Sequence, residues 1–344
     1  MNINEIRELK DYGFVFNGYQ SFIDKSNPSK MAMDAELLTP PNAGVPVEYT
    51  AFLDPTIIRI LNAPTRARRI VGERKIGDWT TPYVRFTMIE QTGFVQPYDD
   101  YADNGKSDVN PTFPTRENYV FETTIEYGDR ESDIASRAKF NLISEKQQSA
   151  ATTIDLAMNR FYFYGVAGLQ NFGLLNDPNL QPALTPANVG TEEAPVVKWE
   201  DKTAVDMYND ILAMVADLSN RSFGYIDENS RLKLVVSPKI SPLLLKTSNL
   251  MTESVKSLIE KSLPNLEIVV APEMSTKAGE LVQMYADVVS ADGVTNKVAD
   301  LVFSEKMRAG RVVPALSHFK QKFTAGTFGA VIFQPFAVAQ MLGV

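Results

Sequence analysis

Two patterns of hydrophobic and polar residues stand out between residues 76 and 127. In 84–89 and 120–127, β-branched and aromatic side chains alternate with polar ones, as is typical of β-strands. The segment 93–117 between them is rich in glycine, proline and aspartate, the residues of turns. We therefore predict one long β-hairpin over 76–127, with 93–117 as its tip. Such a tip cannot reach the core of its own subunit, so packing within the subunit does not explain the length of the hairpin.

A long amphipathic helix is predicted directly after the hairpin, over 129–164. Apolar residues recur there near the helical period, and Asp129, Glu131 and Asp133 suit the positive end of the helix dipole. Gly165 and Gly168 should end the helix. A helix of this length spans about 54 Å at the α-helical rise. We expect it to run across one face of a sheet.

The second half of the chain alternates between helical and strand patterns. After a proline- and glycine-rich loop at 168–197, the periodicity predicts helices over 203–220, 240–246 and 254–263, and strands over 231–236, 266–271, 280–288 and 298–303. This alternation favours a small α/β or α+β domain. A further strand is predicted over 330–333, and we expect the tail after it to return to the sheet that the long helix covers.

Residues 1–52 look like an extended arm. Glycine and proline interrupt every periodic pattern in the arm apart from a short helix expected at 4–11, and a second short helix is expected just after the arm, at 54–61. Large apolar residues are nevertheless scattered through the arm, and a flexible solvated tail does not normally carry them. The arm is either strapped over its own domain or covered by a neighbouring subunit. The sequence favours neither alternative.

Composition narrows the possible functions. Hydrophobic residues at 44% are sufficient for a core, while a net charge of −8 opposes a general attraction to nucleic acid or anionic lipid. The absence of cysteine excludes disulfides, thiolate catalysis and cysteine-based zinc sites. We find no apolar run long enough to span a membrane and no secretory signal. These features suggest a protein made in a reducing cytoplasm.

No catalytic, cofactor-binding or metal-binding residues are predicted. The chain lacks a phosphate loop, a dinucleotide fingerprint, HExxH and GxSxG, and its one histidine, His318, is better explained as structural. The spacing of the aspartates in the hairpin tip does not match a calcium loop. We expect this acidic tip to contact a basic run on a neighbouring subunit. The proposed contact residues are Arg66, Arg68 and Arg69 in the run and Asp99, Asp100, Asp103 and Asp108 in the tip.

The order of arm, hairpin, long helix, compact domain and returning strand resembles the major capsid proteins of tailed bacteriophages, which share the HK97 fold. The resemblance is carried by the hairpin from Trp79 to Tyr127, by the helix after Gly128-Asp129-Arg130-Glu131, and by GLQNFGLLNDP at 168–178. The last segment looks like the glycine-rich turn after the family's spine helix. The resemblance implies an α+β fold, with an N-terminal arm (1–52), a P-domain (53–75, 128–198 and 311–344), an E-loop hairpin (76–127) and an A-domain (199–310).

The resemblance also implies a function. Subunits of this family form hexamers and pentamers that close into an icosahedral shell around double-stranded DNA. The chain would be assembled in the host cytoplasm and end in the virion capsid, with DNA held without sequence specificity and without a membrane. Because Met1 lies almost directly in the arm, a separate scaffolding protein is expected, together with a portal and decoration proteins. Two alternatives are a nanocompartment shell of the encapsulin type and an α/β enzyme whose hairpin is a lid.

Overall fold

Two mixed sheets organise the part of the chain that the computed structural model describes, residues 64–101, 105–191, 196–248, 251–289 and 295–344. These residues all belong to one unit, Asn62–Val344. The expected arm at 1–52 and the short helices at 4–11 and 54–61 lie outside the described residues. Among the described residues, no helix is long and apolar enough to cross a membrane.

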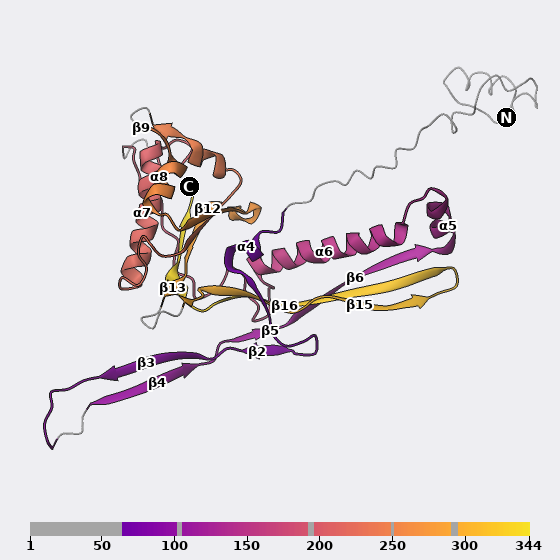
Figure 1. Ribbon diagram of the computed structural model, residues 1–344, viewed down its shortest axis with the longest axis horizontal. Coiled ribbons are helices and arrows are strands. Elements are labelled where there is room, and N and C mark those ends of the chain that lie inside the picture. Colours follow the sequence, from indigo (N-terminus) through magenta and orange to yellow (C-terminus); the bar gives the residue numbers. More distant parts are fainter. Residues whose placement is uncertain (1–63, 102–104, 192–195, 249–250, 290–294) are drawn as a thin grey trace, which may run out of the picture. The chain divides into compact units, whose positions relative to one another are not determined.

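The first sheet carries the long helix. Its strand order is β1 (Glu73–Lys75), β15 (Ala299–Pro314), β16 (His318–Ile332) and β6 (Tyr119–Gly128), with β1 parallel to β15 and the other pairs antiparallel. Helix α6 (Leu142–Tyr164) runs alongside β6, β15 and β16 (Figure 1). It buries Ile154, Met158 and Tyr162 in the core, so the expected position of the helix on one face of a sheet is confirmed.

The prediction of one unbroken helix over 129–164 is wrong. The structure has α5 (Asp129–Arg137) and α6, separated by a turn in which Lys139 has a positive φ of 56°. Asn141 then caps α6, because its side chain accepts a hydrogen bond from the backbone N–H of Ser144 at 3.2 Å. The predicted end at Gly165 is confirmed. Its φ is +61°, and an added Cβ would lie 2.3 Å from the carbonyl oxygen of Asn171.

The hairpin is shorter than predicted, and its strands pair differently. Strand β2 (Tyr83–Arg85) pairs with β5 (Thr115–Glu117), and β3 (Met88–Phe94) pairs with β4 (Lys106–Thr112), which lies within the predicted tip. The expected second arm, β6, pairs instead with β16 over ten positions. The reason is burial: Ile125 of β6 is 8% exposed and belongs to the core. In the sheet, the apolar face of β6 packs in the core beneath α6, whereas in a projecting hairpin it would be exposed to solvent.

The second sheet has the order β10 (Leu266–Val270), β7 (Leu232–Val236), β12 (Gly279–Ala286) and β11 (Ser275–Thr276). Helices α7 (Ala204–Arg221) and α8 (Val255–Ser262) confirm two predicted helices. The third, expected over 240–246, is a short 3₁₀ turn at Ser241–Leu245. The remaining short elements are α4 (Ala67–Val71), β8 (Thr247–Ser248), β9 (Met251–Ser254), β13 (Val288–Val289), β14 (Thr295–Asn296) and the 3₁₀ turns Pro272–Met274 and Pro335–Ala337.

The tail does not return to the sheet under α6, contrary to expectation. Strand β17 (Val338–Leu342) pairs with β12 in the second sheet, where Val338, Ala339 and Met341 are buried. The turn at Pro335–Ala337 redirects the chain, so this apolar segment completes the second core. Strand β15 also runs through the expected boundary at 310/311. The division into arm, E-loop, P-domain and A-domain remains a prediction.

Candidate subunit interface

The outer part of the hairpin exposes apolar side chains on both of its faces. Every residue of β4 is exposed, and β3 is exposed or half-buried throughout. At its end, Val95, Tyr98 and Tyr101 are 96%, 90% and 99% exposed. A two-stranded hairpin alone in water is marginally stable at best, and exposed apolar groups in such a number indicate an interaction surface.

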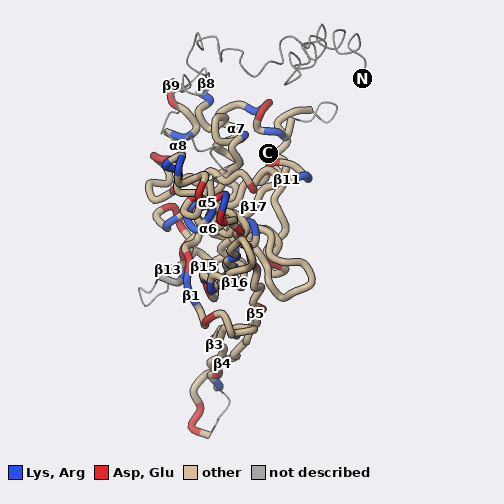
Figure 2. The backbone as a smooth tube through the Cα atoms, turned by 90° about the vertical axis from the view of Figure 1, so that its right-hand side faces the viewer, with Lys and Arg blue, Asp and Glu red and all other residues tan. Residues whose placement is uncertain are grey.

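The described acids of the predicted tip lie at the end of this hairpin. Asp99, Asp100 and Asp108 are all exposed, and Figure 2 shows acidic residues at the far end of β3 and β4. The Tyr98 hydroxyl donates a hydrogen bond to Asp100 at 2.6 Å, which raises the pKa of the tyrosine. Asp103 lies outside the described residues. No group of side chains in the described part of the chain could hold a metal ion.

A buried ion pair fixes the base of the hairpin to the subunit. Arg116 of β5 donates to Asp177 at 2.7 Å, and the two side chains are only 7% and 0% exposed. The guanidinium also lies 4.9 Å from the centre of the Phe172 ring. Burial lowers the pKa of Arg116, and the Asp177 carboxylate opposes that effect. Asp177 and Phe172 belong to the segment GLQNFGLLNDP, which therefore anchors the hairpin.

Backbone contacts reinforce this anchor. The Glu117 N–H donates to the Gln170 carbonyl at 3.0 Å, and the Asn171 side chain donates to the carbonyls of Glu117 and Thr327 at 3.1 and 2.9 Å. Asn171 thus joins the hairpin base to β16 of the first sheet. The sequence analysis missed this function of the loop. The sequence did contain one sign of it, the glycine at position 173. The structure explains this residue, because a Cβ there would lie 2.3 Å from the backbone of Phe163 in α6.

Two arginines of the basic run, Arg68 and Arg69, pair with acids of their own subunit. Arg68 contacts Glu73 at 3.2 Å and Asp155 at 2.5 Å, and Arg69 contacts Glu267 at 2.9 Å. These pairs tie α4 to β1, α6 and β10. The backbone N–H of Arg66 donates to Asn159 of α6 at 3.1 Å. No ion pair of the described residues joins this run to the tip aspartates, and contact between them across two subunits remains a prediction.

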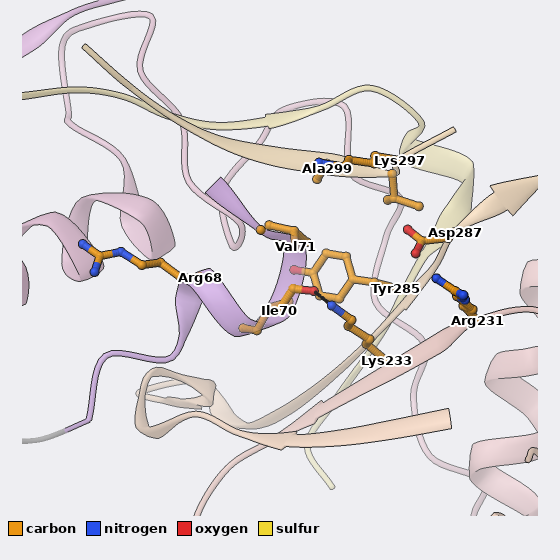
Figure 3. Close-up of a pocket in the computed structure, with 11 residues that line it drawn as sticks. Arg68, Ile70, Val71, Arg231, Lys233, Tyr285, Asp287, Lys297 and Ala299 are labelled. Carbon is orange, nitrogen blue, oxygen red and sulfur yellow. Dashed lines mark hydrogen bonds between the residues drawn. The ribbon is translucent and has the colours of Figure 1, made fainter. Parts of the chain in front are cut away.

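Two adjoining pockets contain basic side chains, and of these the sequence analysis singled out only Arg68. The first, which we call the α4 pocket, measures about 260 Å³ and includes Arg231, Lys233, Asp287 and Lys297. Figure 3 shows Lys233 reaching the Ile70 carbonyl, 2.8 Å away, while the Arg68 guanidinium points away from the other side chains. Its lining comes from α4, β7, β12 and β15, which are far apart in sequence, so no local pattern could have revealed it.

The second pocket, which we call the β2 pocket, measures about 500 Å³ and shares Lys297 with the first. Arg74, Arg85 and Asp300 supply its charges, and its apolar lining is Ile76, Val84, Phe86 and Phe333. Arg74 and Lys297 both pair with Asp300, each at 3.2 Å. Arg85 and Arg231 differ from these cations, because neither guanidinium has a partner among the described residues.

Comparison with known proteins identifies the class. The family model of the Pa193 gp26 major capsid protein matches residues 36–343. The capsid of Myoviridae phage XM1 has a TM-score of 0.70 at 13% identity and covers 88% of this chain and 100% of its own. The native GTA particle capsid has a TM-score of 0.61 at 12% identity and covers 91% of this chain and 100% of its own. The structure of Mycobacterium phage Ogopogo has a TM-score of 0.55 at 9% identity and covers 87% of this chain and 98% of its own.

No curated protein sequence matches the chain significantly. At the identities found, the solved structures establish the fold, and the family model establishes the membership. The predicted α+β, HK97-like fold is thereby confirmed, and so is the phage-capsid interpretation in preference to a nanocompartment shell or an enzyme with a lid. The chain belongs to the family of phage major capsid proteins represented by Pa193 gp26, a family of structural proteins that associate with copies of themselves in the virion shell.

Proposed function

We propose that this chain forms hexamers and pentamers that close into an icosahedral shell around double-stranded phage DNA, and that its hairpin links neighbouring subunits within that shell. The observation that carries the proposal is the exposed apolar surface on both faces of β3 and β4. Val95, Tyr98 and Tyr101 at the end of the hairpin are almost completely exposed. A second copy of the chain would cover this surface in the shell.

The construction of the hairpin suits this function. Its base is held by the buried pair of Arg116 and Asp177, whereas β3 and β4 hydrogen-bond to each other and to no other strand of the described chain. A fixed base and a free outer part allow the hairpin to reach across a neighbour while its own subunit stays folded. A contact from one surface patch to a different patch on the next copy is heterologous, and such contacts can close into rings.

The electrostatics favour a container over a DNA-binding protein. A net charge of −8 opposes tight, sequence-independent binding of phosphates, so packaged DNA would be held without sequence specificity. We assign the chain a structural function without catalysis. Assembly would take place in the host cytoplasm, with a scaffolding protein, a portal and decoration proteins as further partners.

The contact of the tip with Arg66, Arg68 and Arg69 of a neighbour stays a proposal, and for two of these arginines it competes with ion pairs inside the subunit. Arg68 and Arg69 already pair with acids of their own subunit, so binding a neighbour would require breaking those pairs. We propose that these two arginines hold α4 in place. The partner of the acidic tip is better sought among cations that lack a partner.

Sedimentation velocity and electron microscopy of the purified full-length chain test the proposed function. We expect closed particles of uniform size over a range of protein and salt concentrations. A variant in which Gly-Gly replaces residues 88–112 should give a folded subunit that forms no particles, since the bonds that fix the hairpin base remain. If the wild-type chain stays monomeric at every concentration and salt, the proposal is wrong.

A further inference from the structure

Resting on the shell assembly proposed above, we propose that the β2 pocket and the α4 pocket together receive the hairpin tip of a second copy of this chain. The part of the tip that docks is the segment from Val95 to Tyr101, with Asp99 and Asp100 near its end. The proposal thus names the surface to which the tip binds. Three features of the pockets point to this occupant: their charge, their apolar lining and their unpaired arginines.

The charges of the two surfaces are opposite. Six basic and two acidic side chains line the two pockets, in a chain whose overall charge is negative. Arg85 at one end and Arg231 at the other have no acidic partner in the described part of the chain. The tip presents exposed carboxylates at Asp99 and Asp100. Complementary charge across an interface sets the register and selects the partner.

The apolar groups also match. Ile76, Val84, Phe86 and Phe333 line the β2 pocket beside the cations. The tip carries Tyr98 and Tyr101 beside its aspartates, with their rings almost completely in water. Tyrosine is a favoured anchor at protein interfaces, because its ring buries apolar area while its hydroxyl keeps a polar contact. One docking event would therefore cover the exposed rings and neutralise the unpaired arginines.

A nucleic acid fits these observations less well. The phosphate backbone would meet the cations, but it would leave the exposed rings of the tip unexplained. Asp287 and Asp300 also lie in the pockets, where they would repel a continuous line of phosphates. A short segment with two carboxylates can avoid those acids. The observations therefore favour a second copy, and a phosphate backbone becomes an outcome that the experiment can reveal.

The location of the pockets supports a ring of subunits. The β2 pocket is built from the base of the hairpin, including Val84, Arg85 and Phe86, whereas the tip is at the opposite end of the same hairpin. Binding of a tip to a neighbour's hairpin base uses two different patches. Each subunit then gives one tip and receives one, which is an arrangement that can close into a ring.

A charge-swap experiment tests this pairing in the full-length chain. The pocket variant combines Arg85→Glu with Arg231→Glu, which break no ion pair within the subunit. The tip variant combines Asp99→Lys with Asp100→Lys. We expect each to lower the yield of closed particles by about tenfold or more, and the combination of all four to restore most of the yield, since opposite charges face each other again. Arg130→Glu with Lys277→Glu changes two other exposed cations equally and should leave the yield unchanged.

A cysteine experiment keeps the proposal testable if a reversed subunit fails to fold. The chain has no cysteine, so any disulfide must form between introduced residues. Subunits with Tyr101→Cys are assembled together with subunits with Thr87→Cys, which lies in the β2 pocket. Under oxidising conditions we expect a mixed disulfide dimer, and only a trace when Ser275→Cys, at an exposed residue outside both pockets, replaces Thr87→Cys.

The outcomes separate this inference from the proposed function. Normal particle yield in both reversal variants, or the absence of the mixed disulfide from formed particles, overturns the pairing and leaves shell assembly standing. Loss of yield in the pocket variant alone, without rescue by the tip reversal, shows that the pockets bind another anion, such as packaged DNA. A wild-type chain that stays monomeric at every concentration and salt contradicts the proposed function itself.

Discussion

The buried pair of Arg116 and Asp177 allows a quantitative prediction about the anchor of the hairpin. The substitution Arg116→Met keeps most of the side-chain length and removes the charge. It leaves the Asp177 carboxylate, which is fully buried, without its cation. Breaking a buried pair by removing one partner costs about 3–5 kcal/mol. The lost contact of the guanidinium with Phe172 adds to this cost.

A double variant shows whether the cost comes from the unpaired charge. Asp177→Asn removes the carboxylate charge and keeps an oxygen that can accept the 3.0 Å hydrogen bond from the Asn179 N–H. We expect Arg116→Met with Asp177→Asn to recover about 2 kcal/mol or more relative to Arg116→Met alone, because no uncompensated charge remains buried. Arg130→Met, at an exposed site, should stay within about 0.5 kcal/mol of the wild type.

Urea unfolding of unassembled subunits, followed by circular dichroism, measures these free energies. Hydrogen exchange at residues 115–118 should accelerate in Arg116→Met and slow again in the double variant. The reasoning is refuted if Arg116→Met costs less than about 1 kcal/mol, or if the double variant is less stable than the sum of both single changes. In that case the pair would not hold the hairpin base.

Three further predictions concern buried groups elsewhere in the subunit. Burial raises the pKa of Glu273, so the contribution of this carboxyl group to stability is fully present below its usual pKa near 4.5 and is lost as the pH rises through the raised pKa. In urea titrations, Glu273→Gln should therefore be at least as stable as the wild type at pH 7, and the difference in stability should be smaller at pH 4. Gly173→Ala should cost about 1–3 kcal/mol, since its Cβ would meet the backbone of Phe163 at 2.3 Å, and an unchanged melting temperature would contradict this contact. Lys202→Met should cost about 3–5 kcal/mol of folding stability, because it leaves the buried Asp210 carboxylate, 2.5 Å from the lysine, without its cation. The loss of stability can be measured in a denaturant titration followed by the fluorescence of Trp199, which donates a hydrogen bond to the same carboxylate.

The sequence predicted elements best where periodicity and burial agree. The run LKLVV in β7 is buried at four of its five residues, and α7 buries Met207, Ile211, Met214 and Leu218, so each pattern fits a single structure. The pairing of strands was harder to predict. Strand β6 alternates as well in a hairpin as in a sheet, and its true partner, β16, lies about two hundred residues later. Alternation within one segment carries no information about so distant a partner.

The break between α5 and α6 was missed for a different reason. Ala138 and Leu142 continue the helical period, so the apolar pattern predicts one helix. The stronger signal was Asn141, a preferred N-cap residue directly before Leu142. The candidate interface also has a part that the sequence predicts and a part that it does not. The exposed, acidic tip could be predicted from its composition, whereas the pockets bring together residues from six separated elements, α4, β1, β2, β7, β12 and β15, and needed the folded structure.

The most direct test of the account is a cryo-electron microscopy map of assembled particles of the full-length chain. Strands β3 and β4 of each subunit should lie on a neighbouring subunit, with Tyr98 and Tyr101 at the β2 pocket of that neighbour. A map in which every hairpin folds back on its own subunit, or in which the tip contacts no other copy, would contradict the claim that the hairpin links subunits of the shell.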